Sequence, residues 1–198
     1  GLNGLSFYET AQDFKVGAGP AVGSPVNIKV SFPETPWMNY RFPCRTAPAG
    51  TGDQLYLFNT EFAPYAEVRG SFAIDRKPRT EEFSNRYGAY TCAHYFSEYL
   101  KSNGIPVAGG AADIRLGRVR SNLSSNEYGP YAKGVDEMTM LGQTYSPTLS
   151  GIALETNLKS DNFYAETLFR TLGRRLHHSA SYDSSYLAVN EVMKSLGV

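Results

Sequence analysis

The chain has 198 residues, of which 41% are hydrophobic and 19% are charged, a composition typical of a folded globular protein. Its 19 basic and 19 acidic residues balance, so net charge gives no reason to expect nucleic acid or an anionic membrane as a partner. No apolar run of about eighteen residues is present, which excludes a membrane-spanning helix within this sequence. The 14 tyrosines, 11 phenylalanines and 19 glycines favour β-strands joined by many turns.

Residues that bind metals are few and widely spaced. The two cysteines, Cys44 and Cys92, and the three histidines, His94, His177 and His178, lack the spacings typical of zinc sites. Two cysteines do not form a disulfide framework, although a single Cys44–Cys92 bond would suit an oxidising compartment. The sequence leaves free thiols and a disulfide both open, and it implies no metal, nucleotide or other cofactor.

The first 145 residues are predicted to form a β-rich domain. Strand patterns occur over residues 5–8, 13–16, 26–32, 55–58 and 66–74, with further strand-like segments near 112–119 and 138–145. In the segment 26–32 the apolar residues alternate strictly with polar ones. In the segment 66–74, residues 66, 68, 72 and 74 share one face, and Gly70 is typical of a bulge.

One long helix is predicted within this domain, over residues 81–103. Its apolar residues recur at spacings of three and four, which places them on one face. Gly104 and Pro106 then end the helix. The members of this apolar stripe are Ala89, Cys92, Ala93, Phe96 and Leu100.

From Ser146 the pattern changes to three consecutive helices, so we place a domain boundary near residue 145. The first begins at Ser146-Pro147 and runs to Lys159, and the second follows residues 160–162 and weakens or ends at Gly173. The third runs from about residue 183 to Gly197, with Tyr186, Val189, Met193 and Leu196 aligned. Strands followed by consecutive helices indicate an α+β fold.

The tripeptide Ser160-Asp161-Asn162 lies at the junction of the first two of these helices. Serine enzymes that bind penicillin use three separated elements, S-x-x-K, S-D-N and K-T-G. Taken alone, the tripeptide favours a structural interpretation, because Ser, Asp and Asn are the preferred N-cap residues of helices.

The surrounding residues resemble a known family. In the class C low-molecular-mass penicillin-binding proteins, an S-P-x-L segment precedes S-D-N-x-x-A-E, as Ser146-Pro147-Thr148-Leu149 precedes Ser160-Asp161-Asn162-Phe163-Tyr164-Ala165-Glu166 here. These proteins are the serine D-Ala-D-Ala carboxypeptidases and endopeptidases of bacterial cell walls. Residues 2–9, 68–71 and 103–107 are similar to that family's inserted region. The resemblance implies a β-rich inserted domain over 1–145 and a helical piece of the transpeptidase-like catalytic domain over 146–198.

By this resemblance, Ser160 and Asn162 form the second catalytic motif, in which the serine relays a proton and the asparagine amide holds substrate. Lys159, Asp161 and Glu166 match the pattern but are expected to be structural. The resemblance implies a hydrolase, a serine-type peptidase that removes the terminal D-Ala of peptidoglycan stem peptides through an acyl-enzyme. The full-length protein would be acylated by β-lactams in the periplasm or cell envelope.

Two of the three motifs are missing from this sequence. No serine begins an S-x-x-K, and there is no K-T-G or K-S-G; Thr156-Asn157-Leu158-Lys159 and Lys194-Ser195-Leu196 are the nearest matches. In the family these motifs flank the matched region, so we expect a piece of a longer protein that is inactive by itself. Two alternatives stay open: a natural protein that kept the scaffold and lost the chemistry, and a non-catalytic module that binds glycan, peptide or a protein partner through its aromatic-rich β surface.

The three terminal helices bear on the oligomeric state. Their apolar faces would normally pack on parts of a catalytic domain that this sequence does not contain. Exposed apolar faces favour association, which leaves a homo-dimer open.

Overall fold

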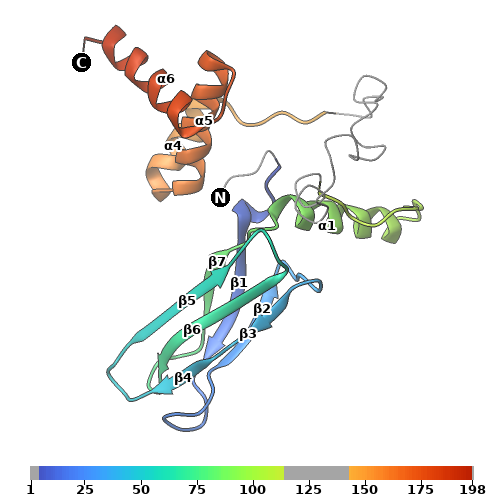
Figure 1. Cartoon of the computed structure of the whole chain (residues 1–198), viewed down its shortest axis with the longest axis vertical. Coiled ribbons are helices and arrows are strands. Elements are labelled where there is room, and N and C mark those ends of the chain that lie inside the picture. Colours follow the sequence, from blue (N-terminus) through green and yellow to red (C-terminus); the bar gives the residue numbers. More distant parts are fainter. Residues whose placement is uncertain (1–4, 114–142, 198) are drawn as a thin grey trace. The chain divides into compact units, whose positions relative to one another are not determined.

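The computed structural model describes residues 5–113 and 143–197, which fall into two compact units (Figure 1). The first unit contains the described residues 5–113 and the second contains the described residues 143–197. Strands precede helices along the chain, which confirms the predicted α+β class.

The first unit begins with a single turn, η1 (Tyr8–Thr10), and then contains seven strands and one helix in its described part. These are β1 (Ala11–Gly17), β2 (Asn27–Phe32), β3 (Asn39–Arg41), β4 (Cys44–Ala47), β5 (Asp53–Asn59), β6 (Tyr65–Ala73), β7 (Arg79–Ser84) and α1 (Gly88–Ser102). The described part of the second unit contains α4 (Leu149–Lys159), α5 (Asn162–His177) and α6 (Tyr182–Ser195).

Two sheets share one core in the first unit. The first sheet is antiparallel, in the order β2-β1-β7, and in the second β6 pairs antiparallel with β5 and parallel with both β3 and β4. Alternation along each strand sends Phe14 and Val16 of β1 and Val68 and Phe72 of β6 inward, where all four are buried. Together with Val26 and Cys44, these residues form the core.

The strand β2 contains one extra residue relative to β1. Val30 lies opposite Phe14, but the next paired residue, Phe32, lies opposite Asp13, so that Ser31 is left without a partner. This is a β-bulge, which reverses the direction of the side chains that follow it. The strict alternation predicted over residues 26–32 therefore ends at Val30, and Phe32 turns to the outer face of the sheet.

On this outer face Phe32 helps to hold α1. Its ring centroid lies 5.6 Å from that of Tyr95, which also stacks on Phe7 at 5.2 Å. The Tyr95 hydroxyl accepts a hydrogen bond of 2.6 Å from the backbone N–H of Glu34, just after β2. The bulge thus creates a second aromatic cluster outside the main core.

The helix α1 begins at Gly88, so the prediction of a helix from residue 81 was wrong. Residues 79–84 instead form β7, in which Glu81 lies opposite Phe14 of β1. The predicted end was correct, because Gly104 has a left-handed backbone and the N–H of Ile105 donates to Leu100. The predicted apolar stripe was only partly right, since Phe96 is 61% exposed and the buried side chains include Thr91 and Ser97.

Two further local predictions were corrected. Residues 5–8 form no strand, and Tyr8–Thr10 is one turn with left-handed backbone at all three residues. Gly70 marks no bulge, because the β5–β6 register runs unbroken through it. Glycine is required there because φ is +120° and a Cβ atom would overlap the carbonyl oxygen of Gln54. At the end of β6 Ala73 is buried and Ile74 is exposed, contrary to the predicted face.

In the second unit, α5 and α6 pack closely at Gly173. The prediction that Gly173 weakens or ends the second helix was wrong, because α5 continues to His177. A Cβ atom on Gly173 would lie only 2.8 Å from the backbone N and Cα of Ser185. Ser185 and Ala188 are fully buried, whereas Tyr186, Met193 and Leu196 of the predicted face are exposed.

The remaining predictions concern cysteines, strands and membrane segments. Cys44 and Cys92 are both free, and Cys44 is buried. The strand-like segments near 112–119 and 138–145 lie mostly outside the described residues, and their described parts form no strand. Over the described ranges, none of the helices combines the length and apolar character that a bilayer crossing requires.

Candidate functional site

The junction of α4 and α5 is built around an unusual backbone at Ser160. This residue follows the last residue of α4 with φ 53° and ψ 41°, the left-handed conformation that glycine most often supplies at a helix end. The backbone N–H groups of Ser160 and Asp161 both donate to the carbonyl oxygen of Thr156. These bonds close the last turn of α4 and fix the direction in which the chain enters α5.

Only one side chain of the tripeptide caps a helix. The Asp161 side chain accepts a hydrogen bond of 2.9 Å from the backbone N–H of Tyr164, and Asp161 is therefore the N-cap of α5. Ser160 and Asn162 are both exposed, and neither side chain forms a hydrogen bond with a described residue. Capping accounts for the aspartate and leaves the serine hydroxyl and the asparagine amide available to a ligand.

The neighbouring charged residues have structural partners. Lys159 forms an ion pair with Glu155 one turn earlier in α4. Glu166, one turn into α5, accepts hydrogen bonds of 3.0 Å from Arg170 Nε and 2.9 Å from the Tyr182 hydroxyl. These contacts agree with the structural roles expected for Lys159, Asp161 and Glu166.

Arg170 connects this carboxylate to the start of α6. Its guanidinium donates to the carbonyl oxygen of Ala180 at 2.9 Å and lies 4.1 Å from the centre of the Tyr182 ring. Partial burial raises the pKa of the Glu166 carboxyl, but hydrogen bonds from Tyr182 and Arg170 more than compensate, so its pKa lies below the ordinary value. The Glu166–Arg170–Tyr182 cluster braces the first half of α5 against α6.

The sequence predicted the α4–α5 junction but not the contact of Tyr182 with Glu166 that stabilises it. The spacing of Glu166 and Arg170 signals an ion pair on one helix face. Tyr182 follows a loop, and nothing local in the sequence signals its contact with Glu166. In the two described ranges, no three histidine, cysteine, aspartate or glutamate side chains lie close enough to hold a metal ion.

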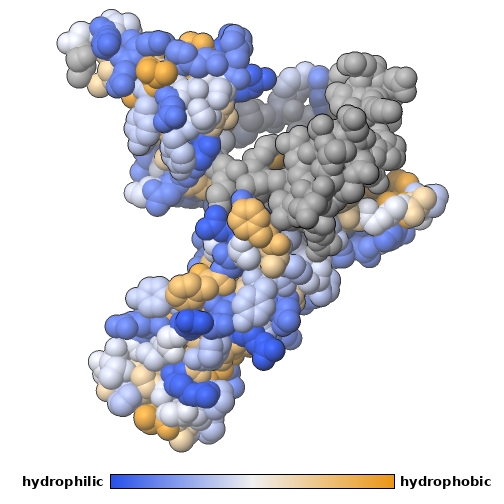
Figure 2. All heavy atoms as spheres, viewed as in Figure 1, coloured by the Kyte–Doolittle hydropathy of each residue, from blue (hydrophilic) through white to orange (hydrophobic). Residues whose placement is uncertain are grey.

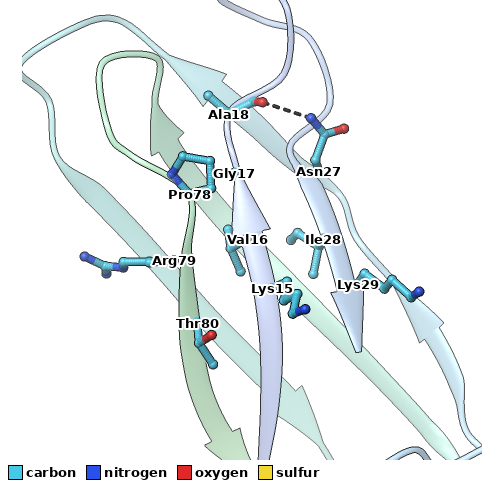
Figure 3. A pocket seen from close by; sticks show the side chains of 10 residues that line it. All are labelled: Lys15, Val16, Gly17, Ala18, Asn27, Ile28, Lys29, Pro78, Arg79 and Thr80. Carbon is cyan, nitrogen blue, oxygen red and sulfur yellow. Dashed lines mark hydrogen bonds between the residues drawn. The ribbon is translucent and has the colours of Figure 1, made fainter. Parts of the chain in front are cut away.

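A second candidate surface lies on the first unit. An open groove of about 560 Å³ runs along the ends of β1, β2 and β7, and Figure 3 shows the residues that line it. On the face presented in Figure 2, hydrophobic and hydrophilic side chains are interspersed. The groove carries lysines and no obvious nucleophile, so it has the character of a binding surface.

Comparisons with known proteins match most of the chain to one family. The model of the D-Ala-D-Ala carboxypeptidase 3 (S13) family matches residues 11–198. A D-alanyl-D-alanine carboxypeptidase of Actinomadura sp. (strain R39) is 28% identical over 153 residues, which cover 77% of this chain and 26% of that protein.

Solved structures show a similar fold. The crystal structure of penicillin binding protein 4 (dacB) from Haemophilus influenzae matches with a TM-score of 0.64 at 18% identity, covering 96% of this chain and 38% of that one. The same protein complexed with a novel beta-lactam matches with a TM-score of 0.60 at 17% identity, over 98% and 42% of the two chains. The chain thus spans about a quarter of its curated relative and about two fifths of these structures.

Proposed function

Because the chain belongs to the D-Ala-D-Ala carboxypeptidase 3 (S13) family, we propose that it is part of a serine-type carboxypeptidase acting on peptidoglycan stem peptides. In this proposal residues 146–198 belong to the catalytic domain, and residues 1–145 form an accessory domain inserted into it. The whole protein works in the periplasm or cell envelope, where its polymeric substrate lies.

The observation that carries the proposal is the state of Ser160 and Asn162. Both side chains are exposed at one turn and have no hydrogen-bonding partner in the described chain. A serine that served only to end a helix would be better replaced by glycine, because a side chain in the left-handed region costs about 1 kcal/mol. A strained residue with an unused hydroxyl supports a functional role at this position.

The proposed chemistry divides the work between this turn and other parts of the protein. The attacking serine and its lysine, and the lysine that binds the substrate carboxylate, come from polypeptide outside this sequence. The serine Oγ adds to the carbonyl carbon of the penultimate D-Ala. Ser160 passes the serine's proton to the amine of the departing D-Ala, and the Asn162 amide holds the stem peptide. Water then hydrolyses the ester and releases the shortened peptide.

Acylation by a fluorescent penicillin tests this proposal directly. The β-lactam carbonyl is attacked by the same serine, so the full-length parent protein labels covalently and the 198-residue chain alone does not. In the full-length protein, Ser160→Ala lowers the acylation rate by about a hundredfold, within the range of general acid–base catalysis. Asn162→Ala lowers it about tenfold, since one substrate hydrogen bond is lost.

Matched controls come from the same helices. Asn157→Ala on α4 and Ser195→Ala at the end of α6 remove the same groups from positions outside the junction, and they leave acylation unchanged. If Ser160→Ala and Asn162→Ala label as fast as these controls, the proposed roles of both residues are wrong.

A further inference from the structure

The groove on the first sheet brings two lysines together on neighbouring strands. Lys15 of β1 and Lys29 of β2 lie directly opposite each other in the antiparallel register, and both side chains are exposed. Figure 3 shows the two residues on neighbouring strands, with the Lys29 side chain extending away from β1, and Asn27 and Thr80 also line the groove. Like charges directly opposite in a sheet repel each other and destabilise it.

No direct ion pair within the described chain offsets this repulsion, and the carboxylates on the same face of the sheet, Asp13 and Glu82, lie two residues further along the strands. Neither Lys15 nor Lys29 forms an ion pair with a described residue, and no carboxylate lines the groove. The third cation, Arg79, differs, because its guanidinium is paired with Asp53 and Glu81 and lies over the Phe72 ring. The groove therefore presents two unpaired positive charges above a single strand pair.

A negatively charged ligand would remove this repulsion. Lysine ammonium groups act as point charges with several donors, which suits a carboxylate approaching from an open surface. The substrate and the product of a D-Ala-D-Ala carboxypeptidase both end in a carboxylate, and peptidoglycan presents many such ends along one polymer. We propose that Lys15 and Lys29 bind stem-peptide carboxylates of peptidoglycan other than that of the peptide being cleaved. The inference rests on the proposed function for the identity of the polymer.

Co-sedimentation with purified peptidoglycan, stripped of phosphate-bearing polymers, tests the proposal on the 198-residue chain and on the full-length protein. The double variant Lys15→Gln/Lys29→Gln binds about thirtyfold more weakly at low salt, in proportion to the loss of two lysines near an anionic surface. Added salt at about 0.5 M weakens the unaltered protein to the same level, because it screens exposed charges. The control Lys101→Gln/Lys194→Gln removes two lysines from other surfaces and retains binding. Equal loss in both double variants would show that only net charge matters and would overturn the proposal.

A charge reversal separates binding from folding. Lys29→Glu places an acidic residue opposite Lys15, so the sheet gains an attractive cross-strand pair and its melting temperature rises. The same change abolishes binding to peptidoglycan. A variant that is more stable and still binds normally contradicts the proposal.

Two further experiments identify the chemical class of the ligand and distinguish a failure of this proposal from a failure of the proposed function. Poly-L-glutamate competes with peptidoglycan for the groove, and tighter binding of polyphosphate than of poly-L-glutamate would refute the assignment to carboxylates. Penicillin acylation of the full-length protein is unchanged in Lys15→Gln/Lys29→Gln. If the unaltered full-length protein is not acylated, the proposed function is wrong. If acylation is normal and the double variant still binds peptidoglycan as well as the unaltered protein, only the proposed role of the groove is wrong.

Discussion

The backbone N–H of Asp161 donates to the carbonyl oxygen of Thr156 at 3.0 Å, spanning Ser160, whose backbone is left-handed. This arrangement ends one helix and begins the next within two residues. It also holds the Ser160 side chain outward at the turn, where it is exposed to solvent. Stability and the proposed chemistry make opposite demands on this residue.

Replacing Ser160 by glycine separates these demands. Glycine adopts the left-handed conformation without steric cost, so Ser160→Gly stabilises the second unit by about 1 kcal/mol. The change also removes the hydroxyl, so acylation of the full-length protein by penicillin falls about a hundredfold. Thermal unfolding and the labelling rate, measured on the same preparation, check both effects.

Ser160→Ala serves as the partner variant. It loses the hydroxyl but keeps a Cβ atom in the left-handed region, so its acylation falls while its melting temperature does not rise. If Ser160→Gly is labelled at the normal rate, the Ser160 hydroxyl has no role in acylation and the residue serves only to end α4.

Gly173 sets the separation of α5 and α6. Gly173→Ala would gain about 1 kcal/mol of helix propensity, but its Cβ atom meets the backbone of Ser185 and forces the helices apart at a cost of about 1–3 kcal/mol. We expect a net loss of stability in thermal unfolding. Ser185→Gly does not rescue the variant, since the contact involves the Ser185 backbone, and Gly109→Ala, which meets no atom within 4 Å, leaves stability unchanged.

The Glu166 carboxylate makes the second unit sensitive to acid. Its pKa is lower in the folded protein than in the unfolded chain, where a glutamate has a pKa of about 4.3. The stabilisation is therefore complete above that value and is lost as the pH falls through the lower, folded pKa. Chemical denaturation between about pH 6 and pH 3 should show this loss, and Glu166→Gln should flatten it. An identical pH profile in the variant would exclude Glu166 as its source.

The two thiols differ in reactivity. Burial raises the pKa of Cys44 to about 11, and its Sγ donates to the carbonyl oxygen of Val68. At pH 8 about one Cys44 in a thousand is a thiolate, so a disulfide reagent modifies it only after unfolding. The half-buried Cys92 reacts first under native conditions. Cys92→Ser should abolish the native reaction, and fast labelling of that variant would contradict the burial of Cys44.

The exposed leucines of α4 lead us to expect that the isolated chain self-associates. It contains no buried residue, and Leu149, Leu154 and Leu158 are 69%, 59% and 73% exposed. Leu154 and Leu158 lie one turn apart on one face of the helix, and exposed apolar side chains placed in this way favour contact with another surface. Light scattering during size-exclusion chromatography should show a mass that rises with concentration. Leu154→Lys/Leu158→Lys should lower that mass, and a strictly monomeric unaltered chain would refute the expectation.

The sequence predicted elements where local patterns and contacts agree. The alternation of β1, the end of α1 at Gly104, and the helices on either side of Ser160 all depend on residues close in the chain. The predictions were wrong where distant residues decide the structure. Residues 81–84 became strand because β1 pairs with them, and Gly173 stayed helical because Ser185 packs against it.

The candidate site shows the same division. The motif and its N-cap could be predicted from residue types alone. The left-handed backbone of Ser160 could not, because the preference for glycine at such positions argues against serine there. The contact of Tyr182 with Glu166 depends on how the α5–α6 loop folds, which no spacing in the sequence reveals.

Ser31, the residue of β2 that has no partner in β1, separates the part of the strand that faces the core from the part that contacts α1. Ile28 and Val30 pack against the core between the sheets, whereas Phe32 contacts Tyr95 of α1. Inserting one residue beside Ser31 would do more than lengthen a strand: Phe32 would move one position past Asp13, point inward and no longer anchor α1. We therefore expect single-residue insertions to be tolerated in the loops around this strand but not beside residue 31, where the spacing holds Phe32 on the outer face of the sheet.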